Sequence, residues 1–305
     1  MKKINYPILA LIIANLIWGA SFPILKLSLE NIPPLSLAFI RFLIAAVILY
    51  PFVHRSTQYS DLKNKWLWVY ALAGITVNIL FFFLALQKTT ALDSTIIASS
   101  GPVMILIGSG IFLREKVKKK AVIGTLFALA GVLLIIIQPI LAREPNSQIL
   151  GNLLMVMATL GSVVSTIAGR KFLTAKNAVG MTFWSCFIGM LTFLPFLFTE
   201  FFADPGWIAR IDYRGIIGIV YASLLSTVVA YTAYDWALAK VSAYRTSVFT
   251  YIDPIASVAL AIPLLGEKIT LPFIAGTILV FGGVFIAERR VQYHPLHLLF
   301  KSGKI

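Results

Sequence analysis

Residues 85–91, ALQKTTA, recur as ALAKVSA at residues 237–243, and the sequence that follows keeps the same offset of 152 residues. Pro102 recurs as Pro254, and a Leu-x-Glu-Lys segment beginning at residue 113 recurs at residue 265. Two glycines continue the series, so that Gly124 and Gly131 are matched by Gly276 and Gly283. Chance similarity does not keep these residues in register without a gap, so the chain contains an internal duplication.

Apolar segments surround and include this duplicated stretch. The chain is 59% hydrophobic, and Asp, Glu, Lys and Arg make up 12% of it, against about 25% in soluble domains. A helix of about 20 apolar residues crosses the ~30 Å hydrocarbon core of a bilayer. The sequence therefore predicts an all-α integral membrane protein with ten transmembrane helices, at residues 7–29, 35–54, 66–86, 90–113, 119–141, 150–173, 178–202, 215–238, 243–265 and 270–288.

The duplication divides these helices into two sets of five. The first repeat covers residues 7–141, the second covers residues 150–288, and residues 289–305 form a short tail. Because five is odd, the second repeat enters the membrane from the opposite face. Inverted repeats of this kind are typical of secondary transporters, whose solute site lies near the midplane between the repeats.

The net charge of +14 could suggest a nucleic-acid surface, but the Lys and Arg residues cluster in the short segments between the apolar runs, which is the distribution typical of membrane topology. With the N-terminus inside, inner segments hold 19 Lys and Arg residues and outer segments hold 5. This asymmetry predicts that both termini are cytoplasmic. The lipid bilayer is thus the expected partner, and nucleic acid is not. Met1–Lys3 precede an apolar run too long for a signal peptide, so this run is expected to be the first span.

The first two helices carry a family pattern. The stretch Leu16-Ile17-Trp18-Gly19-Ala20-Ser21-Phe22, with Lys26 and then Arg41, resembles the EamA-type branch of the drug/metabolite transporter superfamily. The repeated Pro-to-Glu-Lys segment with its spaced glycines is similar to a second mark of that branch. The resemblance implies ten helices, two tandem EamA domains, an inner (cell) membrane location, and often export of amino acids or other metabolites.

Two prolines break predicted helices at equivalent positions. Asp253 precedes Pro254 near the middle of the ninth helix, and Ser99 lies just before Pro102 in the fourth. A carboxylate in the membrane costs about 2.5–3.5 kcal/mol on insertion scales, so Asp253 should face a cavity or a partner. We expect it to bind a solute amine or a proton. The alternative is a structural Asp bonded to a neighbouring helix.

Aromatic and amide side chains accompany the prolines. Together with Ser99, Pro102, Asp253 and Pro254, they form the predicted substrate site: Asn15, Trp18, Asn78, Phe82, Tyr231 and Tyr234. Small-molecule sites commonly combine aromatic walls with a few polar groups. Aromatic residues also fill helical bundles and form interfacial belts, which is the alternative for each of them. Asp235, near the cytoplasmic end of its helix, is expected to be solvated.

Charged residues near the helix ends suggest gates. At the outer face Lys26 and Arg41 would pair with Glu267, and at the inner face Arg170 and Lys171 would pair with Glu115. Alternating access needs contacts that close one face while the other opens. The alternative is that each Glu stabilises the N-terminus of the helix that follows it, the fifth or the tenth.

The function expected from these features is secondary transport of a small metabolite, an amino acid or similar amphipathic solute, with export as the expected direction. Proton coupling is one option. A nucleotide-sugar or other phosphorylated-solute exchanger is the alternative within the superfamily, and a membrane-embedded enzyme or a channel lies outside it. No enzymatic activity, cofactor or metal is expected, since no nucleophile–base pair or metal-ligand cluster is visible in the short loops.

Overall fold

The computed structural model describes residues 5–53, 62–112, 119–142, 146–173, 178–241, 246 and 248–288, and this part of the chain is helical without strands. Each expected apolar run forms helix because it is long, apolar and bounded by turn residues. Six of the helices are uninterrupted: α1 (Tyr6–Ser28), α2 (Pro34–Val53), α7 (Lys119–Ala142), α8 (Asn146–Phe172), α9 (Ala178–Ala203) and α14 (Leu271–Glu288).

The third helix of each repeat contains a π-helical segment. In the first repeat, α3 (Lys65–Ala71) continues through Leu72–Val77 into α4 (Asn78–Leu86). In the second, α10 (Tyr213–Val220) continues through Tyr221–Val229 into α11 (Ala230–Leu238). The α-helical part resumes at residues 78 and 230, which are related by the repeat offset. Short π segments inside helices often mark functional sites.

The fourth helix of each repeat is interrupted at the duplicated proline. α5 (Ala91–Ala98) is separated from α6 (Gly101–Phe112) by two serines, and a 3-10 segment, Val248–Ile252, leads into α13 (Asp253–Leu265). α6 and α13 begin at residues 101 and 253, again one repeat offset apart. The prolines therefore break the two helices at equivalent positions, as predicted.

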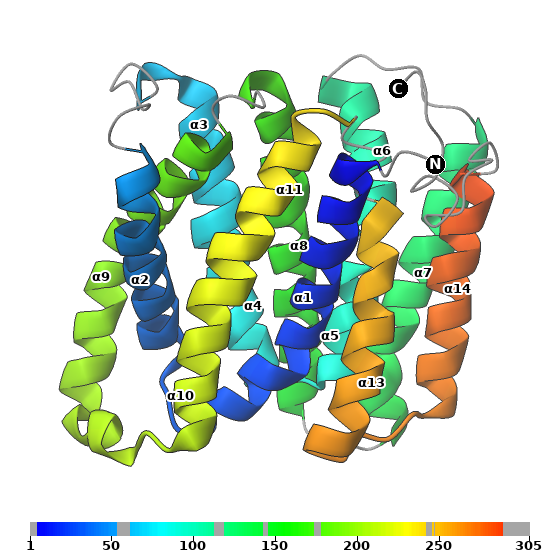
Figure 1. Cartoon of the computed structure of the whole chain (residues 1–305). Helices are drawn as coiled ribbons and strands as arrows, with labels where there is room; N and C mark the ends of the chain where they lie inside the picture. The colour runs from blue at the N-terminus through cyan, green and yellow to red at the C-terminus, as the bar shows by residue number, and fades with distance from the viewer. Residues whose placement is uncertain are drawn as a thin grey trace.

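The helical segments match the ten predicted spans in order, and the predicted fold class is confirmed. Eight of them are long and apolar enough to cross a membrane, and two apolar helices, Phe249–Leu265 and Leu271–Ile286, are shorter. In Figure 1, α1 begins at the upper face, whereas α8 begins at the lower face. The two five-helix repeats are therefore inverted relative to each other.

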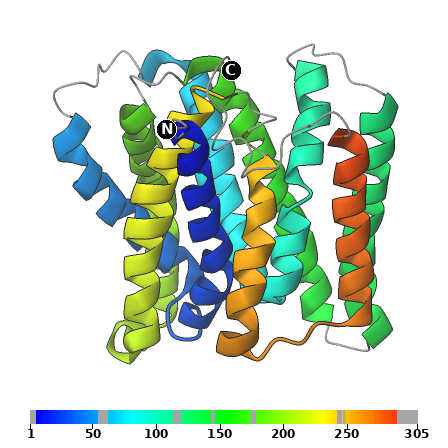
Figure 2. The ribbon, with the colours of Figure 1, turned by 45° about the vertical axis from the view of Figure 1, so that its right-hand side comes forward.

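The contacts between helices follow the inverted symmetry. The two second helices, α2 and α9, pack together, and so do the two fifth helices, α7 and α14. The first helix of each repeat packs against the third and fourth helices of the other, so α1 contacts α11 and α13, while α8 contacts α4 and α6. Figures 1 and 2 show α14 alongside α7 at one edge of the bundle. The centre of the molecule is thus formed by both repeats.

Glycines allow the close approach of α7 and α14. A Cβ atom at Gly283 would lie 2.4 Å from both the Ala128 nitrogen and the Gly124 carbonyl oxygen. A Cβ atom at Gly131 would lie 2.7 Å from the Gly276 carbonyl oxygen. The duplicated glycines therefore face each other across the two repeats, as expected for small residues that bring membrane helices together.

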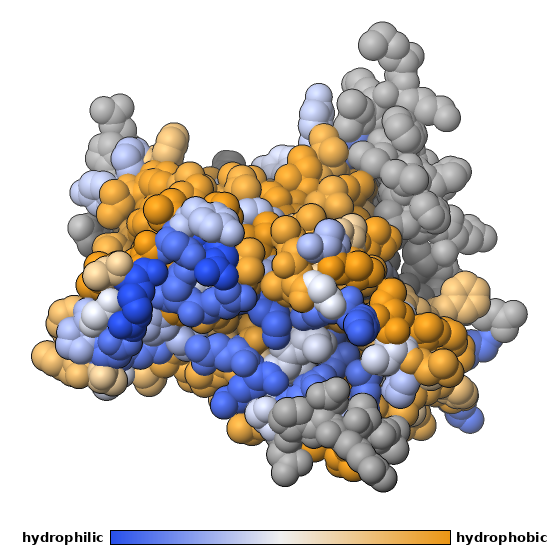
Figure 3. Space-filling view, turned by 90° about the horizontal axis from the view of Figure 1, so that it is seen from below, coloured by the Kyte–Doolittle hydropathy of each residue, from blue (hydrophilic) through white to orange (hydrophobic). Residues whose placement is uncertain are grey.

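Short connections and ion pairs occupy the lower face. Arg214 pairs with Glu30, and its Nε atom lies 2.9 Å from an oxygen of Asp212. Desolvation would raise the pKa of the Asp212 carboxyl, but hydrogen bonds from Arg214 and Asn31 hold that pKa below its ordinary value. Figure 3 shows hydrophilic residues gathered on this face and hydrophobic residues around them. The lower face therefore has the character of a water-exposed end.

Candidate functional site

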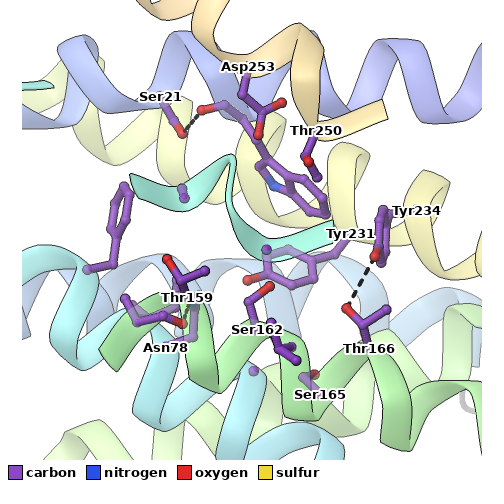
Figure 4. A pocket seen from close by; sticks show the side chains of 18 of the residues that line it. Ser21, Asn78, Thr159, Ser162, Ser165, Thr166, Tyr231, Tyr234, Thr250 and Asp253 are labelled. Carbon is purple, nitrogen blue, oxygen red and sulfur yellow. Dashed lines mark hydrogen bonds between the residues drawn. The ribbon is translucent and has the colours of Figure 1, made fainter. Parts of the chain in front are cut away.

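A cavity of about 160 Å³ lies between the two repeats. Its walls come from α1 to α6 of the first repeat and from α8, α11 and α13 of the second, together with the π-helical segments and the 3-10 segment before α13 (Figure 4). It suits a small solute better than a drug-sized one, whose sites measure about 300–1,000 Å³.

Aromatic rings form one wall of this cavity. The Trp18 ring lies 5.2 Å from the Tyr231 ring and 5.0 Å from the Tyr234 ring, and Phe22 lies 5.2 Å from Phe82 between ring centroids. Trp18 Nε1 donates a hydrogen bond of 3.0 Å to the Ser226 carbonyl oxygen in the π-helical segment. The irregular backbone thus positions the aromatic wall. All four aromatic residues predicted for the site line the cavity.

Hydroxyl groups of α8 form the facing wall. Thr159, Ser162 and Thr166 follow one another at helical spacing, and all three line the cavity. The Thr166 hydroxyl lies 3.3 Å from the Tyr234 hydroxyl, and Asn78 Nδ2 donates to the Ala158 carbonyl oxygen at 2.7 Å. Asn78 was predicted from the sequence, but the three hydroxyl residues were not. Their recurrence along one face of an otherwise apolar helix was the available signal.

Asp253 places a carboxyl group in the cavity. It is the first residue of α13, its exposed fraction is 8%, and its Oδ1 atom has no hydrogen-bond partner among the described residues. Gly19 of α1 permits this placement, because a Cβ atom there would lie 2.4 Å from the Asp253 carbonyl oxygen. Figure 4 shows the Asp253 side chain beside Thr250, across from Ser162 of α8. An unpaired buried carboxylate of this kind can bind a cationic group.

Arg41 also lies at the cavity, although the sequence suggested a gate at the outer face. Its Nε atom donates to Thr227 Oγ1 at 2.9 Å, and its Nη2 atom lies 3.4 Å from Ser226 Oγ. The guanidinium carbon is 5.0 Å from the centre of the Phe42 ring. No ion pair between Arg41 and Glu267 occurs within the described residues. The hydroxyls of the π-helical segment direct Arg41 inwards instead.

Three predicted site residues do not line the cavity. Asn15 is fully buried and donates to the Leu11 carbonyl oxygen at 2.7 Å, and Ser99 donates to the Thr95 carbonyl oxygen at 2.8 Å. Pro254 is buried beside Asp253. Asn15 and Ser99 thus donate to carbonyl groups of their own helical segments, and Pro254 lies at the helix break that begins α13. The other seven predicted residues line the cavity.

The predicted outer gate has a different geometry from an ion pair. Lys26 Nζ donates to the Thr89 carbonyl oxygen and, at 3.2 Å, to that of Leu86, at the C-terminal end of α4. The Glu267 carboxylate accepts from the Ala91 and Leu92 nitrogens, at 2.7 and 2.9 Å, at the N-terminus of α5. Each charge thus matches the dipole of a helix end. We call Lys26, Glu267 and the turn between α4 and α5 the turn clamp.

The turn clamp corrects two expectations. No ion pair joins Lys26 to Glu267 in the described part of the chain. Glu267 also does not cap the tenth helix that follows it, since both carboxylate oxygens accept from α5 of the other repeat. The reason is geometric: the connection from α13 to α14 passes the start of α5, where backbone N–H groups lack partners within their helix.

The inner gate is only partly described. Glu115 lies outside the described residues. Arg170 Nη1 donates to the Leu238 carbonyl oxygen at 3.1 Å, and Lys171 Nζ lies 3.9 Å from the centre of the Trp66 ring. These contacts link α8 to α11 and α3 respectively.

Asp235 is buried, contrary to the expectation that it is solvated. Its exposed fraction is 0%, and its two oxygens accept from the Tyr70 hydroxyl at 2.5 Å and from Thr182 Oγ1 at 2.7 Å. Tyr70 itself lines the cavity. Position near a helix end suggested solvent, but α3 and α9 cover this side chain.

Comparison with known proteins agrees with this architecture. A model of the EamA-like transporter family matches residues 5–137 and 149–288. The chain belongs to this family. The resemblance seen in the sequence is thereby confirmed, and the two matches reflect the internal duplication.

Relatives of this EamA-like chain are named as transporters. It is 28% identical over 285 residues to an uncharacterised transporter of Archaeoglobus fulgidus, covering 92% of this chain and 97% of the relative. It is 25% identical to a probable amino-acid metabolite efflux pump of Escherichia coli, with 92% and 93% covered. A crystal structure with a TM-score of 0.66 and 18% identity, covering 96% of this chain and 100% of that one, shares the fold. The chain is therefore a multi-pass membrane transporter.

Proposed function

We propose that this EamA-like protein is a secondary transporter that moves a small amphipathic metabolite, such as an amino acid, across the cell membrane by alternating access. The observation that carries the proposal is the cavity between inverted repeats, where both fourth helices are broken and both third helices contain a π-helical segment. Discontinuous helices at a repeat interface are where secondary transporters bind solute. Export is the proposed direction, in keeping with a relative named as an efflux pump.

The lining of the cavity supports an amphipathic solute. Aromatic rings offer apolar surface, while the hydroxyls of α8 offer hydrogen bonds. Asp253 offers a negative charge for an amine or, in a coupled cycle, a site for a proton. The relative's name, probable amino-acid metabolite efflux pump, agrees with a solute of this size and polarity.

The turn clamp is the proposed outer gate. It connects the turn between α4 and α5 to α1 and to the connection between α13 and α14. The helices joined by this turn carry Asn78 and Phe82 of the cavity wall, so its release would move that wall. Glu267 and Lys26 would then act through helix ends instead of through each other.

The orientation of the protein follows from its charges. We place the upper face of Figure 1, where α1 begins and α14 ends, in the cytoplasm because inner segments hold 19 of the Lys and Arg residues. All ten helical segments then cross the membrane. The repeat boundaries, residues 7–141 and 150–288 followed by the tail 289–305, belong to the same proposal.

The phosphorylated-solute exchanger is disfavoured by the cavity. Among the described residues its lining holds one cation, Arg41, whereas a diphosphate needs several cationic or N–H donors. A cavity of about 160 Å³ is also small for a nucleotide sugar.

Purified protein in sealed vesicles tests the proposal. A panel of amino acids, amines, organic acids and sugar phosphates is loaded, and efflux is measured with and without a pH gradient. We expect at least one small amphipathic solute to leave faster than from vesicles without protein. Acceleration of sugar phosphates alone, or of no member of the panel, would contradict the proposed function.

A further inference from the structure

Arg41 is the most deeply buried charge of the cavity, and the described protein supplies no carboxylate for it. Its exposed fraction is 1%. Two of its donor atoms, Nε and Nη2, reach hydroxyl oxygens, and its Nη1 atom has no recorded partner among the described residues. The three ion pairs recorded in the described ranges all lie at the lower face. The cation therefore lines the cavity without a counter-charge from the described residues.

A buried guanidinium group without a counter-charge costs free energy unless an anion binds beside it. Arginine stays protonated in proteins, so it cannot relieve its burial by losing a proton. Hydroxyl groups supply acceptors but no negative charge. Buried charges are ordinarily paired, and an unpaired intramembrane cation points to a functional partner.

Asp253 is not that partner. Both residues line the cavity, yet no ion pair within 4.0 Å joins them in the described structure, and Asp253 Oδ1 remains unpaired. They come from α2 of the first repeat and α13 of the second. One cavity thus holds a separate cation and a separate carboxylate.

We infer that Arg41 is the anion-binding residue of the cavity and selects solutes that carry a carboxylate. Guanidinium binds carboxylate through two parallel hydrogen bonds, and the free Nη1 atom of Arg41 is available for such a bond. This inference rests on the proposed function and adds a specificity to it. With Asp253 as the site for an ammonium group, the preferred solute is a small zwitterion bound between the two repeats.

Matched solutes test the inference without changing the protein. L-Valine, L-valinamide and 3-methylbutanoate share the same side chain. The first carries both charges, the second carries only the amine and the third carries only the carboxylate. The same triads are built on alanine and phenylalanine. Efflux from vesicles is measured for each, and binding to the purified protein is measured by calorimetry.

In the wild-type protein we expect the zwitterion to bind at least about 100-fold more tightly than its amide, since removing one partner of a buried charge pair weakens binding by two or more orders of magnitude. Arg41→Gln should weaken zwitterion binding to the level of the amide, so that the ratio falls to about one. Arg41→Lys keeps the charge without the planar fork and should retain part of the ratio. Asp204→Asn, at a half-exposed position on the lower face outside the cavity lining, should leave the ratio unchanged.

The outcomes separate the two proposals. If amides or amines are carried as well as zwitterions, and Arg41→Gln does not alter their ratio, then Arg41 does not select the solute, while the transport function stands. If no solute is carried, the transport function itself fails. Should Arg41→Gln not fold, the wild-type ratio and the Arg41→Lys ratio still decide, since equal binding of acid and amide in both proteins would overturn the inference.

Discussion

Asp253 and Arg41 are the two charged residues that line the cavity in the described part of the chain, and irregular backbone lies next to each of them. Asp253 begins α13 at a helix break, next to a glycine of α1 that leaves room for it. Arg41 is bound by hydroxyls of a π-helical segment. The helix break places Asp253 directly, whereas Arg41 projects from the uninterrupted helix α2 and is oriented by the hydroxyls across from it.

Asp253→Asn is the direct test of the proposed role of the carboxylate. We expect solute efflux to fall more than tenfold, since a charge partner at a desolvated site is worth about 2–5 kcal/mol. The melting temperature should not fall, because the substitution removes a buried unpaired charge. Efflux assays in vesicles and thermal unfolding in detergent give the two readouts.

Asp204→Asn is the matched control. Asp204 pairs with Arg210 on the lower face, and its side chain is 53% exposed. This variant should keep wild-type efflux. Unchanged efflux and unchanged pH dependence in Asp253→Asn would reduce Asp253 to a structural residue.

At the residue scale, the sequence was informative where a residue type is costly in a membrane. Asp253 stood out for this reason, whereas Trp18 and the tyrosines of α11 stood out as aromatic side chains suited to a small-molecule site, and all of them line the cavity. Arg41 was noticed but misplaced, because its hydroxyl partners lie 185 and 186 residues away in the chain. The hydroxyls of α8 are common in membrane helices, so no single one was conspicuous.

At the element scale, the turn clamp links helix ends from both repeats. A cation lies at the C-terminus of α4 and an anion at the N-terminus of α5, which is the favourable arrangement for both dipoles. The sequence suggested an ion pair because Lys26 and Glu267 share a face. Their actual partners are backbone groups, which a sequence does not display.

Glu267→Gln should weaken the clamp and favour the outward-open state. Loss of a charged cap costs about 1 kcal/mol, which changes a two-state equilibrium about fivefold. A cysteine at Ser162, in a background where the buried Cys186 is alanine, reports on this change through its reaction with an impermeant maleimide added outside. We expect the reaction to be about fivefold faster in the variant, in keeping with that free energy.

Charge exchange distinguishes the clamp from an ion pair. If Lys26 and Glu267 acted on each other, the double variant Lys26→Glu with Glu267→Lys would restore wild-type labelling. The clamp predicts no restoration, because both exchanged charges oppose the helix dipoles. Recovery in the double variant would therefore contradict the clamp.

The packing of α7 on α14 offers a second test at this scale, with two adjacent glycines on one helix. A Cβ atom at Gly283 meets backbone atoms of α7 at 2.4 Å, whereas a Cβ atom at Gly282 has nothing within 4 Å. Gly283→Ala should lower the stability by about 1–3 kcal/mol, as overpacking does. Gly282→Ala should leave it unchanged or raise it slightly, because alanine favours helix. Equal melting temperatures for the two variants would argue against close packing here.

At the scale of the whole molecule, the duplication predicted more than the number of helices. The offset of 152 residues relates the helix breaks at Gly101 and Asp253 and the ends of the two π-helical segments. The prolines indicated the breaks. Nothing comparable marked the π segments, because their residues are ordinary apolar and small ones. The packing of equivalent helices of the two repeats against each other could be expected from their inversion. The cavity volume could not, because it depends on side-chain packing that no pattern in the sequence specifies.

Alternating access requires that one cavity open to each side of the membrane in turn. The Ser162→Cys protein in sealed vesicles tests it, with impermeant maleimide added outside or enclosed inside, and a cysteine at Ile208, exposed on the lower face, as the marker of orientation. We predict labelling of residue 162 from both sides, protection by a transported solute, and opposite changes when Glu267→Gln is added: faster from outside and slower from inside. Labelling from one side under every condition, or rates that rise together on both sides as in an open pore, would contradict the account.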